Sequence, residues 1–173
     1  MSTIQDAMLF TQKEEGGWTP IDGGTMYGVT QAVYDDYRRK EGMHLQNVRL
    51  IEDGEVRAIM EDEYWYPGHC NEMPSRLAIA HFDWIFNHGV SGAIHSLQTV
   101  LGVVSDGVFG PVTLHAMQAA IQEDPNGLIQ KYLDARREWY REYVVTVPEK
   151  AVYLNGWLNR VDALETYLQG IAA

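Results

Sequence analysis

Two acids and a threonine lie close together near the start of the chain, among two pairs of glycines. Glu15 ends an amphipathic segment, Asp22 follows it after a glycine-rich stretch, and Thr25 comes next. Hydrolysis of a glycosidic bond uses one carboxylic acid to protonate the leaving oxygen and a polar partner to manage water or positive charge. These residues are suited to that chemistry. A capped helix end followed by an ordinary Asp-Gly turn would have the same sequence, so both interpretations stand at this point.

Residues 2–14 are expected to form the helix that positions the first acid. At about 100° per residue, Ile4, Met8 and Glu15 fall on one stripe of that helix, within roughly 20° of one another. Glu14 points away from the stripe. Glu15 therefore continues an apolar face, where partial burial would favour the protonated carboxyl that a general acid needs.

The rest of the chain is patterned as helix, which predicts a mainly α fold with a compact helical body. Residues 76–87 carry apolar side chains around most of the circumference and are expected to form a buried central helix. The β structure expected is a short hairpin near residues 18–30. Further helices are expected at residues 31–40, 52–65, 91–101, 111–122, 128–143 and 151–169, with a connector at 43–50 and breaks at 124–127 and 148.

The composition is that of a globular chain with a strong acidic balance. The chain has 173 residues, of which 46% are hydrophobic, and a net charge of -11. That size predicts one domain with a substantial core. The charge argues against nucleic-acid binding, which needs a basic footprint. Since no secretory signal is visible, no apolar run could span a bilayer and Cys70 is the lone cysteine, we expect synthesis in a reducing cytoplasm.

For the other charged or reactive residues, the sequence favours a structural interpretation. Arg38-Arg39-Lys40 and Arg136-Arg137 could contact a substrate or a surface, although a solvated helix face is the more frequent meaning of such runs. Cys70 has no identifiable base to activate it as a nucleophile. We expect no metal and no cofactor, because the histidines at and around Cys70 lack the paired spacing of a zinc site; these four are His69, His81, His88 and His95.

The opening segment resembles the signature of glycoside hydrolase family 108 in three consecutive motifs. They are Glu15-Gly16-Gly17-Trp18, Asp22-Gly23-Gly24-Thr25 and Tyr27-Gly28-Val29-Thr30. The likeness continues in order along nearly the whole chain, through Tyr64-Trp65 with Pro67, Leu77-Ala78, Phe82-Asp83, Asn87-His88-Gly89, Leu97-Gln98, Leu101-Gly102-Val103, Asp106 to Leu114 and Gly156 to Val161. The family comprises lysozyme-like N-acetylmuramidases found among phage endolysins and bacterial cell-wall enzymes.

The resemblance implies a lysozyme-like fold and a catalytic assignment. The expected reaction is hydrolysis of the β-1,4 bond between N-acetylmuramic acid and N-acetylglucosamine in peptidoglycan, with Glu15 as general acid. Asp22 would orient the attacking water or stabilise the transition state, and Thr25 would help to hold that water. The loop that joins them is shorter than is usual in the family, so Thr19 or Thr30 could take the role of Thr25.

Four further residues are expected to bind substrate. Trp18 and Tyr27 lie in the active loop itself, where aromatic faces can stack on sugars. Asn87 and His88 follow the central helix and could bind an acetamido group, although the same residues could simply end that helix. Asp106-Gly107 and the residues after it are expected to form a turn that fixes two helices of the same body.

The single domain is expected to have two lobes, a catalytic lobe at about 1–72 and a helical peptidoglycan-binding region at about 73–173. The expected partner is the glycan strand of peptidoglycan, reached in the wall or periplasm after release or export, with no membrane insertion and a monomeric protein. Two alternatives remain. A lytic transglycosylase would use Glu15 as both acid and base and would not need Asp22, and a non-catalytic peptidoglycan-binding protein would keep the fold alone.

Overall fold

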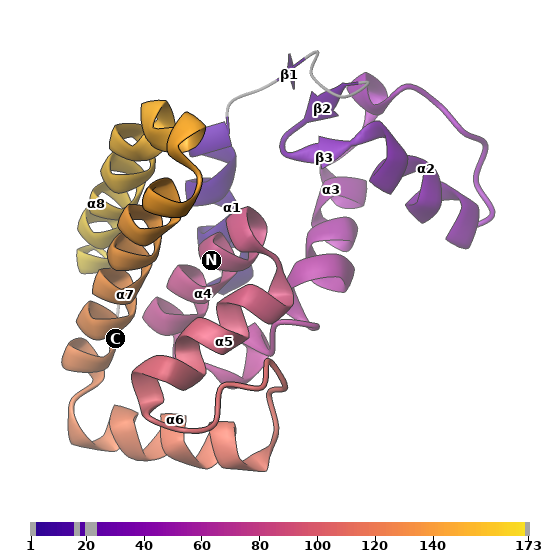
Figure 1. The fold of residues 1–173 in the computed structure, drawn as a ribbon. Helices are drawn as coiled ribbons and strands as arrows, with labels where there is room; N and C mark the ends of the chain where they lie inside the picture. The colour runs from indigo at the N-terminus through magenta and orange to yellow at the C-terminus, as the bar shows by residue number, and fades with distance from the viewer. Residues whose placement is uncertain (1–2, 16–17, 20–23, 172–173) are drawn as a thin grey trace.

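The computed structural model describes residues 3–15, 18–19 and 24–171, without the side chains of residues 15 and 19. Most of these residues are helical, which confirms the mainly α fold class (Figure 1). No helix in these ranges has the length and apolar character needed to cross a membrane. In chain order the elements are α1 (Thr3–Glu15), β1 (Trp18–Thr19), β2 (Thr25–Met26), β3 (Val29–Thr30), α2 (Gln31–Lys40), η2 (Val48–Leu50), α3 (Asp53–Met60), η3 (Glu61–Trp65), η4 (Cys70–Glu72), α4 (Ser75–His88), α5 (Val90–Leu101), α6 (Pro111–Glu123), α7 (Pro125–Thr146), η5 (Pro148–Tyr153) and α8 (Leu154–Gln169).

The elements form a helical body and an arm (Figure 1). The body contains α1 and α4 to α8, and α7 and α8 make a long hairpin along one side of it. The arm contains the three-stranded sheet, α2, η2 and α3, and projects from the opposite side. The division into lobes at about 1–72 and 73–173 stays a prediction, and α1 packs with α4 and α8 of the body.

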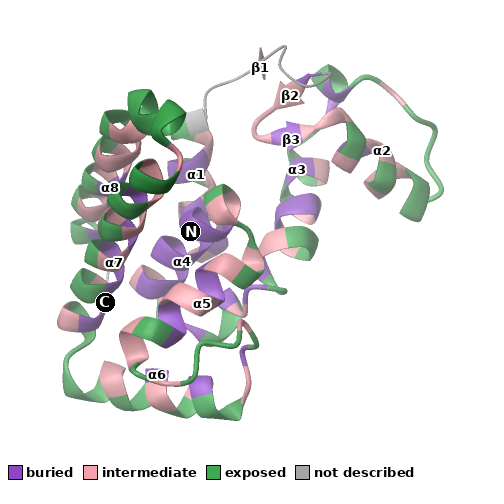
Figure 2. Cartoon of the chain, viewed as in Figure 1, coloured by how far each residue is buried: buried purple, intermediate pink, exposed green. Residues whose placement is uncertain are grey.

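Helix α4 lies at the centre of the body, as its composition predicts. All residues from 77 to 85 are buried, and α4 is accordingly drawn mostly purple in Figure 2. It contacts α1, α5, α7 and α8. A helix that is apolar around its circumference is stable only with neighbours on every side, because each buried Leu, Ile or Phe contributes about 1.5–3 kcal/mol.

Helix α2 and the sheet confirm two local predictions. The helix occupies the residues expected for it, 31–40, because the Thr30 side chain caps its first turn by accepting from the Val33 amide at 3.3 Å. The hairpin expected near residues 18–30 is an antiparallel sheet in the strand order β1-β2-β3.

The start of α7 differs from the prediction. Residues 124–127 were expected to break the chain, yet the helix begins at Pro125. Asp124 Oδ1 accepts from the Gly127 amide at 2.9 Å, and Pro125 needs no amide partner at the first helical position. At the other end of the hairpin, α8 begins at Leu154 rather than 151, because residues 148–153 form the 3-10 helix η5.

Candidate active site

Helices α1 and α4 run parallel in one register. Thr3 Oγ1 and Ser75 Oγ are hydrogen bonded at 3.1 Å, and Thr11 Oγ1 donates to Asp83 Oδ1 at 3.1 Å. Each pair is separated by 72 positions along the chain. Two contacts with the same offset, two helical turns apart, mean that the helices stay in step along this length.

The same register reaches the first predicted catalytic residue. Glu15 stands one turn beyond Thr11, and Asn87 stands one turn beyond Asp83. Both helices continue through these positions. The backbone of Glu15 is therefore set level with that of Asn87, another residue predicted for the site. The side chain of Glu15 and the whole of Asp22 lie outside the described residues.

A buried ionic cluster holds this end of α1 against the body. Arg136 Nη1 of α7 donates to Asp83 Oδ2 at 2.7 Å, and Arg160 Nη2 of α8 donates to Asp83 Oδ1 at 2.7 Å. Thr11 reaches the same carboxylate from α1. Burial alone would raise the pKa of Asp83, but the charges of Arg136 and Arg160 outweigh it and hold that pKa below its ordinary value. One carboxylate thus joins four helices.

The tip of the sheet packs on the other side of the same region. Tyr27 and Gly28 both adopt positive φ, 52° and 80°, in the two-residue turn between β2 and β3. A Cβ atom on Gly28 would lie 2.1 Å from Phe86 Cζ of α4, so only glycine allows this close approach. Phe86 directly precedes Asn87 in α4. The contact therefore brings the turn that contains Tyr27 to the end of α4.

The three threonines considered for one catalytic role lie in a single row. Thr25 of β2 is directly opposite Thr19 of β1 and Thr30 of β3. The side chains of Thr25 and Thr30, which are directly opposite in an antiparallel pair, point to the same face. Thr30 already uses its hydroxyl oxygen to cap α2. Because the three threonines are neighbours in the sheet, the sequence alone could not show which of them has the catalytic role.

Trp18 already has protein partners on its ring. The Arg49 guanidinium lies 4.0 Å from the ring centroid, and a Cβ atom on Gly24 would approach Trp18 Cη2 to 2.1 Å. Cation–π contact with Arg49 steadies the indole on the sheet. Binding of substrate by Trp18 stays a prediction.

Asn87 and His88 have different surroundings although they are neighbours. Asn87 is exposed, and its Nδ2 donates to the backbone oxygen of Asp83 at 2.7 Å. The His88 ring packs edge-on against Trp139, with centroids 3.9 Å apart. Burial lowers the pKa of His88, and the nearby charge of Arg136 lowers it further, so the ring is neutral at pH 7.

The observed burial of α1 differs in detail from the apolar face predicted for this helix. The buried face contains Ile4 as expected, but Ala7 and Thr11 are buried more deeply than Met8, which is only partly covered. Glu14 is exposed and lines a pocket of about 640 Å³ beside α8.

The two cationic runs are ion paired; Arg39 and Lys40 lie on an exposed helix face, as the more frequent meaning of such runs predicts, whereas Arg136 is buried and differs from it. Arg136 is almost fully buried in the ionic cluster, and Arg137 binds Asp162 and Glu165 of α8. In the arm, each charge of the run has an acidic partner: the pairs are Arg38–Glu55, Arg39–Asp36 and Lys40–Glu63.

Cysteine and histidine have structural surroundings. Burial raises the pKa of the Cys70 thiol, which keeps it protonated and unreactive. His81 is fully buried with its Nδ1 2.5 Å from the Tyr132 hydroxyl, and burial lowers its pKa to about 3. In the part of the chain that the structure describes, no group of three His, Cys, Asp or Glu side chains could hold a metal ion.

The Asp106 segment is a turn that fixes α5 against α6. Asp106 Oδ1 accepts from Gln98 Nε2 at 2.7 Å and from the Val108 amide at 2.9 Å, and the Gly107 amide donates to Gln98 Oε1 at 2.8 Å. Gln98 is buried. These bonds within one turn account for the motif without a ligand.

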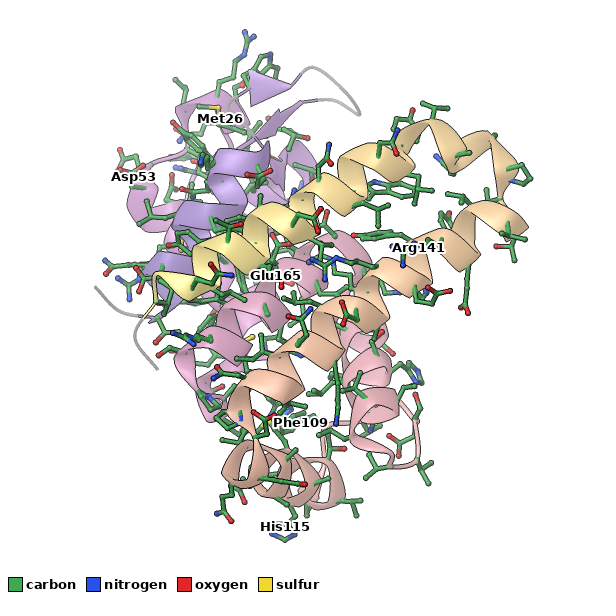
Figure 3. All side chains as sticks on the ribbon, turned by 90° about the vertical axis from the view of Figure 1, so that its left-hand side faces the viewer. Met26, Asp53, Phe109, His115, Arg141 and Glu165 are labelled. Atoms are coloured by element: carbon green, nitrogen blue, oxygen red, sulfur yellow. The ribbon has the colours of Figure 1, made fainter. Side chains whose placement is uncertain are left out.

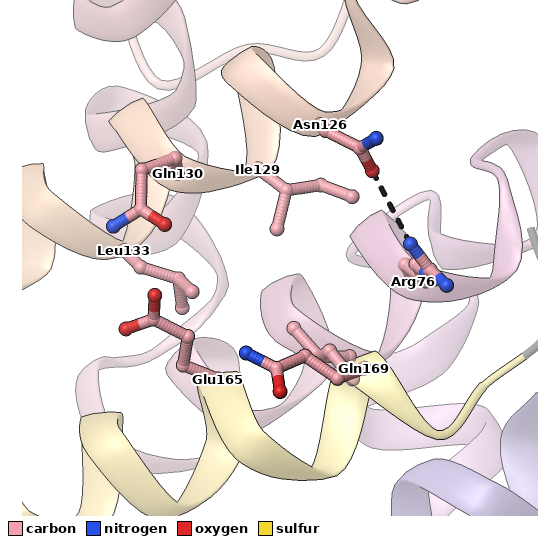
Figure 4. A pocket seen from close by; sticks show the side chains of 8 residues that line it. Arg76, Asn126, Ile129, Gln130, Leu133, Glu165 and Gln169 are labelled. Atoms are coloured by element: carbon pink, nitrogen blue, oxygen red, sulfur yellow. Dashed lines mark hydrogen bonds between the residues drawn. The ribbon is translucent and has the colours of Figure 1, made fainter.

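A pocket of about 340 Å³ lies between α7 and α8, at the end of α4 opposite to Asn87 (Figure 4). It contains Arg76 and Asn126, which are hydrogen bonded at 3.2 Å, together with Glu165. Residues 76 and 87 are separated along α4 by about 16 Å, at 1.5 Å per residue. This pocket is therefore separate from the candidate site.

Sequence reasoning did not foresee the ionic cluster. A single aspartate inside an otherwise apolar helix must be paired when it is buried, and that was the available signal at Asp83. Its partners, Arg136 and Arg160, lie far along the chain, and no local spacing connects them.

Two family models match consecutive parts of the chain. Residues 8–89 match the family described as Glycosyl hydrolase 108, and residues 92–162 match the family described as Predicted Peptidoglycan domain. The first match contains the second half of α1, the sheet and α4, which build the candidate site. The solved structure of Brucella abortus SagA is similar, with 26% sequence identity and a TM-score of 0.76 over 96% of this chain and 94% of that one. No curated protein matches the sequence. The chain is thus a peptidoglycan-degrading glycosidase, in which a region that matches glycoside hydrolase family 108 is followed by a region that matches a peptidoglycan domain.

Proposed function

We propose that this enzyme is an N-acetylmuramidase, which hydrolyses the β-1,4 bond between N-acetylmuramic acid and N-acetylglucosamine with Glu15 as general acid. The observation that carries the proposal is the shared register of α1 and α4, which sets the backbone of Glu15 level with the exposed Asn87. A general acid must be held at a fixed point relative to the sugar. The buried cluster around Asp83, one turn below, supplies that rigidity.

The remaining roles follow from the family resemblance and, for Thr25 and Asn87, also from the surroundings of each residue. Asp22 would act as the second carboxylate, orienting water or stabilising positive charge on the ring. Thr25, at the centre of the threonine row, would help to hold the water. The Asn87 amide would bind an acetamido group. The wall is the proposed site of action, which the enzyme would reach after release or export.

Mass spectrometry of the fragments released from purified peptidoglycan tests the proposal. The wild-type protein should release fragments with reducing muramic acid ends, and Glu15→Gln should reduce the rate about a hundredfold or more, the scale of general acid catalysis. Glu14→Gln is the matched control, because its carboxylate is exposed one residue away. Equal losses in both variants would contradict the choice of Glu15.

The second carboxylate separates hydrolysis from transglycosylation. Asp22→Asn should also reduce hydrolysis strongly, with the reducing ends unchanged in kind. Anhydro-muramic ends from the wild-type protein, together with full activity of Asp22→Asn, would instead identify a lytic transglycosylase. If the wild-type protein releases no fragments at all, the muramidase proposal fails.

A further inference from the structure

Tyr64 lies where the arm joins the body. It belongs to η3, which continues α3 of the arm and packs on α4 of the body. Met26 of β2 and Asp53 of α3 mark the arm in Figure 3. The element is a π turn, in which the Tyr66 amide donates to the Glu61 oxygen at 3.0 Å, one residue farther along the chain than in an α-helix. Since single π turns are frequent at functional sites, this one points to a functional side chain in η3.

The Tyr64 ring packs against α4 at two points. Its centroid lies 6.5 Å from that of Phe82 and 5.4 Å from that of Phe86. Phe86 is also the ring that Gly28 of the sheet turn approaches, and it directly precedes Asn87. Tyr64, Phe86 and the sheet turn thus meet beside Asn87, at the candidate site.

The Tyr64 hydroxyl is a hydrogen-bond donor that the protein itself does not use. Tyr64 is half-buried, and its hydroxyl has no partner in the part of the chain that the structure describes. Burial raises the pKa of Tyr64, and the charge of Glu63 raises it further, so the hydroxyl keeps its proton at pH 7. A buried tyrosine ring usually brings its hydroxyl to a partner. Here the hydroxyl is available to a ligand.

Asn87 offers the complementary group. Its Nδ2 donates to the backbone oxygen of Asp83 at 2.7 Å, and its Oδ1 accepts from no residue that the structure describes. An acetamido group has one N–H donor and one carbonyl acceptor. An acceptor on Asn87 and a donor on Tyr64 match that pair. A sugar with a free amine lacks the carbonyl oxygen that the tyrosine would bind.

We propose that the Tyr64 hydroxyl donates to the acetamido carbonyl oxygen of a sugar in the candidate site and makes the enzyme selective for N-acetylated glycan strands. This deepens the proposed function and rests on it for the identity of the substrate. Phe82 and Phe86 hold the ring in place. Tyr64 binds substrate through one hydrogen bond and takes no part in bond cleavage.

Tyr64→Phe tests this role, because it removes the hydroxyl and keeps the ring. The rate of fragment release from native peptidoglycan, as kcat/KM, should decrease about three- to tenfold, the scale of one hydrogen bond. Release from de-N-acetylated peptidoglycan should equal that by the wild-type protein, and Tm should not change. Tyr66→Phe is the matched control, because Tyr66 directly follows η3 and is 54% exposed.

An equal loss on both substrates would overturn the proposal, since the hydroxyl would then act on the fold rather than on the acetamido group. Full activity of Tyr64→Phe on native peptidoglycan would overturn it as well. If the wild-type protein releases only anhydro-muramic ends, the muramidase assignment fails, and the comparison of the two substrates still decides the role of Tyr64.

A binding measurement covers the case in which the wild-type protein releases no fragments. In sedimentation with insoluble sacculi, Glu15→Gln protein should bind the native form more tightly than the de-N-acetylated form. Adding Tyr64→Phe should reduce that preference about three- to tenfold. A preference that Tyr64→Phe leaves unchanged would overturn the proposal, whatever the outcome for bond cleavage.

Discussion

The body and the arm each contain a carboxylate that gathers several donors, yet the two clusters have different surroundings. In the body, Asp83 is fully buried and binds side chains from three other helices. In the arm, Glu55 binds Arg38 and the Tyr34 hydroxyl, and water still reaches this pair, since the Arg38 and Glu55 side chains are 13% and 12% exposed. A charge without water depends entirely on its partners, whereas water can replace a partner near the surface. The body therefore provides the rigid part of the site.

Neutral substitutions of the two carboxylates, Asp83 and Glu55, should show this contrast most strongly. Asp83→Asn removes the carboxylate that Arg136 and Arg160 both bind in the core, and breaking such a buried pair costs about 3–5 kcal/mol. Glu55→Gln keeps shape and should cost about 1–2 kcal/mol, the loss of a hydrogen bond to a charged group. Urea unfolding of both variants measures the difference. Equal losses would mean that the buried cluster is no more dependent on its charges than the arm.

Acid should weaken the body through His81. Its folded pKa of about 3 lies below the ordinary value of 6.5, so the unfolded chain binds a proton first as the pH falls. The contribution of His81 to the free energy of unfolding should be complete above pH 6.5 and should decrease toward pH 3. The decrease between pH 6.5 and 5 should be about 2 kcal/mol. Thermal unfolding of wild type and His81→Gln across this range measures the slope.

The His81→Gln variant should keep only a shallow slope, because the pKa of His88 is also lowered by burial. The lowered pKa of Asp83 acts in the same direction, but only as the pH falls through the acidic range of a carboxylate. A wild-type Tm that is flat from pH 7 to 5 would be inconsistent with a neutral, buried His81.

The contact between arm and body can be broken at one glycine. Gly28→Ala would place a Cβ atom 2.1 Å from Phe86 Cζ and should displace the sheet, which we expect to reduce activity about tenfold. Gly42→Ala meets no atom within 4 Å although its φ is also positive, at 67°. It should lower stability by about 1–2 kcal/mol, the strain of φ alone, with full activity. Peptidoglycan turnover and Tm together distinguish the two effects.

The sequence predicts the parts of this fold that depend on neighbours along the chain. Helix α2 and the central helix follow from local pattern and capping, as at Thr30. The start of α7 was missed because Asn126-Gly127 has the composition of a break, while the cap at Asp124 decides the outcome. The local pattern also predicted that Arg136 is a surface charge, because no residue near it in the sequence indicates that it pairs with Asp83.

In the candidate site, too, the sequence predicts the local features and misses those that depend on distant parts of the chain. A helix end with an acid at position 15 can be read from spacing. The level of its backbone relative to that of Asn87 cannot, because it arises from an offset of 72 positions between two helices. The position of Trp18 between Gly24 and Arg49 likewise depends on how the sheet folds back on itself.

The fixed offset between α1 and α4 limits how the chain can change in length. One residue inserted between Thr11 and Glu15 would move the acid about 1.5 Å along the axis and turn it by about 100° around it. The helix would persist and the fold would survive, but the acid would face another direction. Substitutions can therefore accumulate along α1 more freely than insertions or deletions, and the five residues from Thr11 to Glu15 form the segment whose length matters most.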